Sequence, residues 1–185
     1  MARAPRIQAP HATYHVNTVA VAEAAIVATD ADRSLFVAIV AQTVTAFNWV
    51  CLSFCLMDNH YHLVVTTPEP DLAVGIQRLN GNYARLFNRR HGRKGHLFGA
   101  RYHPELIESD GHLLATIRYV ALNPVRAGMC ARPEQWEWSS YPGLVGSARP
   151  RPFVANDVVL ELFGGPIEGP ARVRRFVDDA PGLAA

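Results

Sequence analysis

Residues 49–66 read WVCLSFCLMDNHYHLVVT, and this stretch decides the fold. Two largely apolar runs, 49–57 and 60–66, flank an Asp-Asn pair of the kind that favours a tight turn. Both runs are rich in β-branched and aromatic residues, which pack well on a pleated surface. The pattern predicts a β-hairpin.

The segments on either side of this hairpin alternate between strand and helix patterns. The first strand should place Tyr14 and Val16 on one side, and the third helix should end around Asn123, because Pro124 disfavours helix at the residue before it. In chain order, the sequence predicts strands at 11–20, 49–57, 60–66 and 101–107, with helices after Asp30, over 71–90 and over 110–123. This order indicates an α+β fold, a ferredoxin-like antiparallel sheet with helices packed on it.

The amino-acid composition of the chain changes after Tyr141. Residues 142–152 are rich in Gly, Pro and Arg and read as a linker, with short helices expected at 155–163 and 170–177. We therefore expect one folded domain over residues 12–142, followed by a linker and short C-terminal helical tail over 143–185.

Composition indicates a folded protein, since 49% of the 185 residues are apolar. No apolar run approaches the ~18 residues that span a bilayer, so no membrane segment is expected. The first residues lack the apolar core of a secretory signal, and a cytoplasmic location follows as a default. The three cysteines form no CxxC pair, and Cys51 and Cys55 are expected to share one face of a strand as packing residues.

The formal net charge is only +2, but the basic residues are unevenly distributed along the chain. No Asp or Glu interrupts the stretch from Arg78 to Arg101. A basic stripe on a nearly neutral protein indicates one polyanion-binding face. The side chains expected to contact phosphates are Arg85, Arg89, Arg90, Arg93, Lys94 and Arg101.

The sequence His60-Tyr61-His62 lies on the second strand of the hairpin. Successive side chains on a strand point to opposite faces, so the two histidines share a face about 7 Å apart along the backbone. Two neutral imidazoles at this spacing can converge on one metal ion. Taken alone, the pattern fits ordinary strand histidines better.

A second candidate element is RYVALNP, in which Tyr119 and Asn123 lie four residues apart on one face of a helix. The amide oxygen could be a third metal ligand beside a phenol that attacks a metal-bound phosphate. Taken alone, a core tyrosine and a helix-ending asparagine explain the pattern better. Tyr83 is a rival nucleophile, but it continues the buried row of its own helix and is expected in the core.

Four stretches occur together in this order: MDNHYHLVV, YARLFNRRHGRKGHLF, RYVALNPVRAG and PEQWEWSSY. In these stretches the chain resembles the REP-associated tyrosine transposases, which belong with the single-tyrosine transposases to the His-hydrophobic-His nuclease superfamily. The resemblance covers residues 12–142. One departure is that the first strand continues as NTVAVAEAA, where that family has an Asn-Arg-Gly segment.

The resemblance implies a role for each matching residue. Tyr119 is implied as the nucleophile, with His60, His62 and Asn123 as ligands of Mg²⁺ or Mn²⁺. The implied partner is single-stranded or hairpin DNA, with no small-molecule cofactor. The implied reaction cuts a strand, leaves a 5′-phosphotyrosine and a free 3′-hydroxyl, and can rejoin the ends.

Two other functions compete with this interpretation. A catalytically inactive nucleic-acid-binding module of the same fold would keep the basic stripe and form no covalent adduct. A metal-dependent hydrolase of small phosphate esters would need the extra Asp and His residues of a two-metal site, which the sequence lacks. The Trp136, Trp138 and Tyr141 rings could stack on bases, although packing against the sheet is the stronger expectation.

Overall fold

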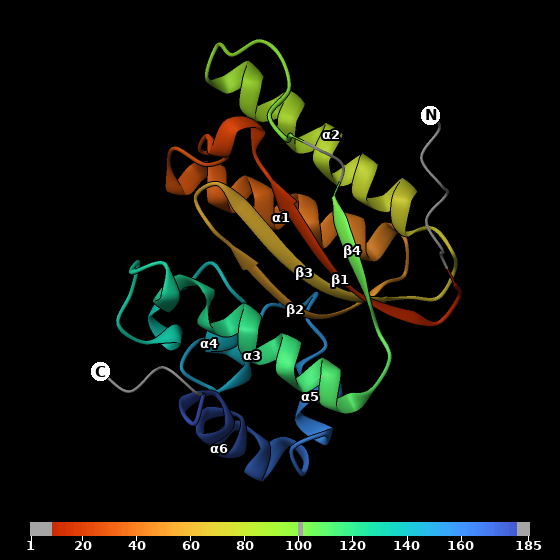
Figure 1. Cartoon of the computed structure of the whole chain (residues 1–185), viewed down its shortest axis with the longest axis vertical. Coiled ribbons are helices and arrows are strands. Elements are labelled where there is room, and N and C mark those ends of the chain that lie inside the picture. The colour runs from red at the N-terminus through yellow and green to blue at the C-terminus, as the bar shows by residue number, and fades with distance from the viewer. Residues whose placement is uncertain (1–8, 100–101, 181–185) are drawn as a thin grey trace.

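The protein is described by a computed structural model over residues 9–99 and 102–180, and four strands form one sheet within it (Figure 1). The strands are β1 (Ala12–Val19), β2 (Val50–Leu56), β3 (His60–Thr67) and β4 (His103–Ile107). Their order is β2-β3-β1-β4, and every neighbouring pair is antiparallel. The predicted α+β fold with a ferredoxin-like antiparallel sheet is confirmed.

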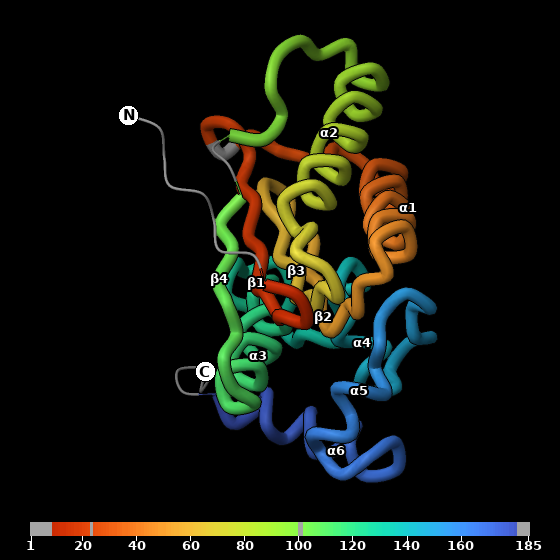
Figure 2. The backbone as a smooth tube through the Cα atoms, turned by 90° about the vertical axis from the view of Figure 1, so that its right-hand side faces the viewer, coloured from red at the N-terminus to blue at the C-terminus, as the bar shows by residue number. Residues whose placement is uncertain are grey.

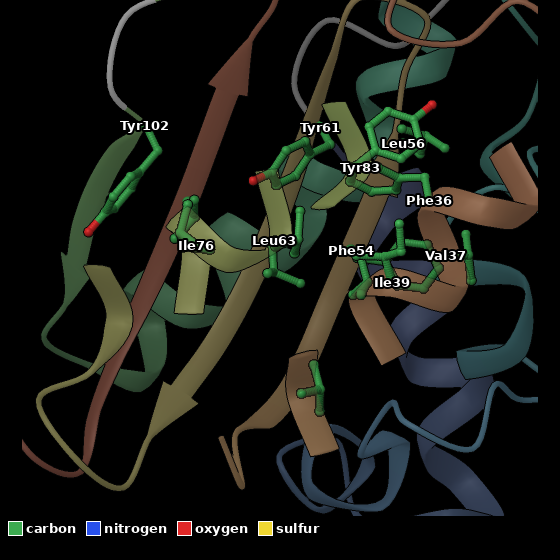
Figure 3. Close-up of a cluster of buried hydrophobic side chains, with 14 of the residues drawn as sticks. Phe36, Val37, Ile39, Phe54, Leu56, Tyr61, Leu63, Ile76, Tyr83 and Tyr102 are labelled. Carbon is green, nitrogen blue, oxygen red and sulfur yellow. The ribbon is translucent and has the colours of Figure 1, made fainter. Parts of the chain in front are cut away.

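The two faces of the sheet build two separate cores. On one face, Tyr61 and Leu63 of β3 pack with side chains of α1 (Asp30–Ala46) and α2 (Leu72–Arg90). Figure 3 shows these two residues beside Phe36, Ile76 and Tyr83. On the other face, Val64 packs with α3 (Asp110–Arg126) and the C-terminal helices. The sheet is therefore a middle layer between two sets of helices (Figure 2).

The two helices of the first core are tied together by one buried carboxylate, Asp32. It completes a capping box with Thr29 at the start of α1. At the end of α2, the Arg90 guanidinium lies 2.8 Å from Asp32 Oδ1, and His91 Nε2 lies 3.0 Å from Oδ2. Burial acts to raise the pKa of Asp32, but the hydrogen bonds from His91, Arg90, the Ala28 amide and the Thr29 hydroxyl outweigh it and hold the pKa well below its usual range.

The two cysteines of β2 lie in different cores, so the expectation that they share a face is wrong. Cys51 belongs to the core under α1 and α2, whereas Cys55 packs with α3. The strand pairing shifts register between Cys51 and Ser53. Such a bulge inserts one residue and turns the following side chains to the opposite face. Both cysteines are free and buried.

Helix α3 continues one turn past Asn123, so the predicted end at that residue is also wrong. Pro124 lies inside the helix and is buried. The helix ends with the Ala127 amide donating to Asn123 O and the Gly128 amide donating to Val125 O. A proline in the last turn removes a single backbone hydrogen bond, and the buried ring packs in exchange.

The C-terminal part of the chain packs on the sheet and on α3. Short α4 (Tyr141–Leu144) and α5 (Asn156–Glu161) lead to α6 (Gly165–Asp178), whose Val173 and Val177 are buried in the second core. Isolated bridges join Cys51 to Val154 and Cys55 to Ser139. The residues assigned to a linker and tail thus complete the core below α3. Among the residues that the structure describes, no helix combines the length and apolar character of a membrane span.

We expect Asp32→Asn to lower the free energy of unfolding by about 3 kcal/mol at neutral pH. The new NH₂ group would face donors that now point at a carboxylate. Because the pKa of Asp32 is lowered in the folded protein, its contribution is present above the unfolded pKa of about 4 and is lost as the pH falls below it. Urea unfolding at several pH values checks this, and the difference between the two proteins should shrink in acid.

The matched control is Asp30→Asn, which changes an exposed carboxylate in the same first turn. The Asp30 side chain is 75% exposed, and its partner Arg33 keeps a second ion pair with Asp58, so we expect little effect. Equal destabilisation by the two substitutions would mean that Asp32 does not join the helices.

Candidate active site on the α3 face of the sheet

Three neighbouring strands, β3, β1 and β4, supply the floor of the site. His62 of β3 lies directly opposite Asn17 of β1, and His15 lies two residues before Asn17 on the same face. On β4, Glu105 lies opposite His15. Because Tyr61 and Leu63 are held in the first core, the side chains that alternate with them must point toward α3.

The predicted pair His60 and His62 is brought together, with ring centroids 5.0 Å apart. Burial lowers the pKa of both imidazoles. For His62, burial and the neighbouring His15 and His60 lower the pKa to about 3. Both rings are therefore neutral at physiological pH, which is the form in which imidazole binds a metal ion.

Tyr119 of α3 stands over this floor, and 42% of its surface is exposed. Its ring centroid lies 5.4 Å from that of His62 and 6.0 Å from that of His15. The adjacent Val120 is fully buried, which anchors this turn of the helix against the sheet. The arrangement presents a phenol to solvent directly beside two neutral imidazoles.

Asn123 lies one turn further along α3, with its Nδ2 3.3 Å from the Tyr119 carbonyl. Its side chain acts on both His60 and His62, where it raises the pKa against the larger effect of burial. The spacing of Tyr119 and Asn123 therefore brings the amide to the histidine pair, as the sequence indicated. Arg126 follows, and its guanidinium carbon lies 5.5 Å from the centroid of the Tyr119 ring.

The donor set fits a divalent metal ion. His62 Nε2 is buried and has no hydrogen-bond partner, so its lone pair would be available to a metal ion. His60 Nδ1 lies 2.7 Å from Asn59 Oδ1, and since that oxygen can only accept, Nδ1 carries the proton and Nε2 keeps its lone pair. Within residues 9–99 and 102–180, no three His, Cys, Asp or Glu are grouped to hold a metal. The Asn123 amide, which acts on both histidines, would be the third protein ligand of such an ion.

The basic stripe, of which residues 78–99 are described and which is called the basic segment from here on, lies mainly on the other face of the sheet. Most of it belongs to α2, and α2 covers the first core. Arg85, Arg89 and Lys94 are exposed, and Arg93 is half-buried. Arg90 is already paired with Asp32, whereas Arg101 lies outside the described residues. The segment returns toward the site at its end, where the Val21 amide donates to Leu97 O and the Gly99 amide to Val19 O.

Other aromatic candidates are structural. Tyr83 is fully buried and its hydroxyl donates to Ile26 O at 2.6 Å, which confirms its place in the core. Trp136 Nε1 donates to Leu56 O, Trp138 packs against the first core, and Tyr141 is buried in the second. The packing interpretation of these rings is confirmed.

Sequence reasoning missed His15, Glu105 and Arg126. A signal for His15 was present, because placing Tyr14 and Val16 on one side of the first strand leaves His15 and Asn17 on the other. Arg126 lies seven residues after Tyr119, close to two turns along the same helix face. Nothing local marks Glu105, which meets His15 only through the pairing of β1 with β4.

The chain matches one family model and one curated protein. The model described as "Transposase IS200 like" matches residues 8–123. A protein of Haemophilus influenzae described as a REP-associated tyrosine transposase is 26% identical over 111 residues, 54% of this chain and 63% of that protein. The chain therefore matches less than two thirds of the length of that relative.

Solved structures show the same fold. A REP-associated tyrosine transposase bound to a REP hairpin superposes with a TM-score of 0.67 at 15% identity, covering 85% of this chain and 90% of that chain. The tRNA(His) guanylyltransferase of Saccharomyces cerevisiae gives 0.51 at 9% identity, covering 96% and 80%. The two proteins are named for different reactions, so these likenesses show the fold and leave the reaction to the site.

The family model covers well over half of the chain, from the first strand to Asn123. Its range includes His60, His62 and Tyr119, and the resemblance inferred from the four motifs is confirmed. The chain belongs to the IS200-like transposase family.

Proposed function

We propose that this protein is a metal-dependent single-stranded DNA endonuclease and strand transferase, with Tyr119 as its nucleophile. One observation carries the proposal: the exposed Tyr119 phenol lies beside His62, whose buried Nε2 has no hydrogen-bond partner and whose ring is paired with that of His60. The relative of known structure was solved with a REP hairpin, and we propose DNA with an exposed single strand, such as a hairpin, as the substrate class here.

The site residues have two different roles in the proposed strand cleavage, metal binding and nucleophilic attack. His60, His62 and Asn123 would hold Mg²⁺ or Mn²⁺, which withdraws charge from the scissile phosphate and orients it for in-line attack. The Tyr119 oxygen forms a bond to phosphorus while the bond from phosphorus to the 3′-oxygen breaks. The phenol proton passes to solvent, to which Tyr119 is open, and the departing 3′-oxygen takes up a proton from water.

Strand transfer is the same exchange in reverse. A 3′-hydroxyl attacks the 5′-phosphotyrosine, and the phosphorus–tyrosine bond breaks as the new diester forms. The bond energy is kept in the covalent intermediate, so joining needs no external energy source. Arg126 contributes a cation next to the phenol ring, where it favours the negative charge that develops on Tyr119 as its proton leaves.

The DNA path proposed here passes from the basic segment to the site. Arg85, Arg89, Arg93 and Lys94 are the proposed phosphate contacts, along with Arg101. Arg90 contributes less, because its charge is already balanced by Asp32. Since α2 lies on the opposite side of the sheet from Tyr119, the DNA must pass around the end of the sheet where residues 97–99 meet β1.

We expect Tyr119→Phe to abolish cleavage of a single-stranded hairpin while leaving folding and binding unchanged. The substitution removes only the attacking oxygen from an exposed ring. Tyr83→Phe is the matched control: it should lose about 1 kcal/mol of stability with its hydrogen bond and keep cleavage. Denaturing gels and circular dichroism measure both effects. Cleavage that survives in Tyr119→Phe would refute the assignment of the nucleophile.

Removal of the metal should stop cleavage without unfolding the protein. Chelation is expected to abolish cleavage, and added Mg²⁺ or Mn²⁺ should restore it. His60→Ala and His62→Ala should each remove activity, whereas Asn123→Ala should reduce it less, since water can replace a neutral amide oxygen. Undiminished cleavage in excess chelator would exclude the metal role.

Salt titration tests the basic segment. Each phosphate contact on single-stranded DNA contributes about −0.7 to the slope of log affinity against log salt, so Arg85→Ala/Arg89→Ala should flatten the slope by about 1.4. The loss should be similar for unrelated sequences, because phosphate contacts do not read bases. The matched control, Arg172→Ala/Arg175→Ala, removes the same charge from α6. Equal slopes for both double variants would place the DNA elsewhere.

A further inference from the structure

We propose that His15 and Glu105 form a hydrogen-bonded chain that fixes His62 in the tautomer with a proton on Nδ1 and a free lone pair on Nε2. The inference rests on the proposed function, because the lone pair on Nε2 is what a metal ion would use. In this role His15 and Glu105 are positioning residues that act through His62.

The chain begins with a direct contact between two buried rings. His15 Nε2 lies 3.0 Å from His62 Nδ1, and the ring centroids are 5.2 Å apart. His15 is 9% exposed and His62 is 1% exposed, so water does not compete for this hydrogen bond. Two neutral rings can share only one proton here, and either nitrogen can be the donor. The direction must be set by the groups beyond the pair.

Glu105 sets the direction. Its Oε2 lies 3.5 Å from His15 Nδ1, at the end of the ring that faces away from His62. A carboxylate only accepts hydrogen bonds, so it favours a proton on His15 Nδ1. Neutral His15 then keeps a lone pair on Nε2 and must accept from His62 Nδ1. The proton on Nδ1 leaves His62 Nε2 unprotonated.

The far end of the chain agrees with this direction. His62 Nε2 is buried without a hydrogen-bond partner. The lone pair of such an unpartnered buried atom can be satisfied by a cation, whereas a protonated Nε2 could not bind one. His60 has the same tautomer by a simpler route, since Asn59 Oδ1 accepts the proton of its Nδ1. Both imidazoles thus present an unprotonated Nε2. For His60 the tautomer is fixed by the neighbouring Asn59, and for His62 it is fixed by the hydrogen-bonded chain through His15 to Glu105, which crosses three strands.

The carboxylate is itself held in place from two sides. Glu105 is paired with His15 across the β1–β4 ladder, and its Oε1 lies 3.4 Å from His112 Nε2 on α3. The Glu105 side chain is 62% exposed, so its removal should not disturb the core. His15, in contrast, is buried between His62 and Tyr119, and its replacement must preserve a ring or a chain of similar length.

Two variants of His15 separate hydrogen bonding from packing. His15→Phe keeps a planar ring and removes the acceptor, and Mn²⁺ affinity measured by electron paramagnetic resonance should fall 10- to 100-fold, as is typical when a metal ligand loses its supporting partner. His15→Gln offers a carbonyl oxygen to His62 Nδ1 and should largely restore the affinity. Glu105→Ala should lower the affinity in the same direction. His103→Gln, on the same strand but outside the chain, should leave it unchanged.

The tautomer is read directly in the metal-free protein. Long-range ¹H–¹⁵N correlation spectra of the full chain should show His62 protonated at Nδ1, with a shift toward the other tautomer in His15→Phe and Glu105→Ala. A proton on Nε2 in the wild type, or equal Mn²⁺ affinity in the wild type and His15→Phe, would overturn the inference. Failure of the wild type to bind Mn²⁺ would instead overturn the proposed metal-dependent function.

Discussion

The alternation of side chains along β3 is the constraint on which the site depends. Tyr61 and Leu63 are locked into the core beneath α1 and α2, and Tyr61 also donates from its hydroxyl to Asn80. A strand has a period of two residues, so a slip of one position would drive His60 and His62 into that apolar core and expose the tyrosine and leucine. The packing of Tyr61 and Leu63 on one face therefore fixes His60 and His62 on the opposite face.

Helix α3 adds the second half of the site by the same logic. Ile117, Val120 and Ala121 are buried against β2 and β3, and this leaves Tyr119 at the edge of the contact, above the histidines. A side chain held by a packed helix keeps its position while remaining exposed to solvent, as the proposed role of Tyr119 requires. The C-terminal helices support this arrangement from below, because Val173 and Val177 close the core that α3 shares with the sheet.

Local patterns predict much of this arrangement. The hairpin, the shared face of His60 and His62, and the helical spacing of Tyr119 and Asn123 all follow from strand and helix periods. Contacts between distant segments were not predictable. The bulge that places Cys51 and Cys55 on different faces depends on the pairing of β2 with β3. The Arg90 guanidinium is paired with Asp32, which lies 58 residues away in the sequence. Glu105 meets His15 across 90 residues of sequence, and no periodicity within either strand indicates that meeting.

The most direct measurement is identification of the residue that carries DNA after cleavage. The protein would be incubated with a cleavable single-stranded hairpin and Mg²⁺, denatured, and digested with a protease and a nuclease for mass spectrometry of the peptides. We expect a nucleotide attached through a 5′-phosphodiester to the peptide that contains Tyr119, and to no other tyrosine peptide. Cleaved DNA with no covalent peptide, or with the adduct on a different tyrosine, would contradict the mechanism.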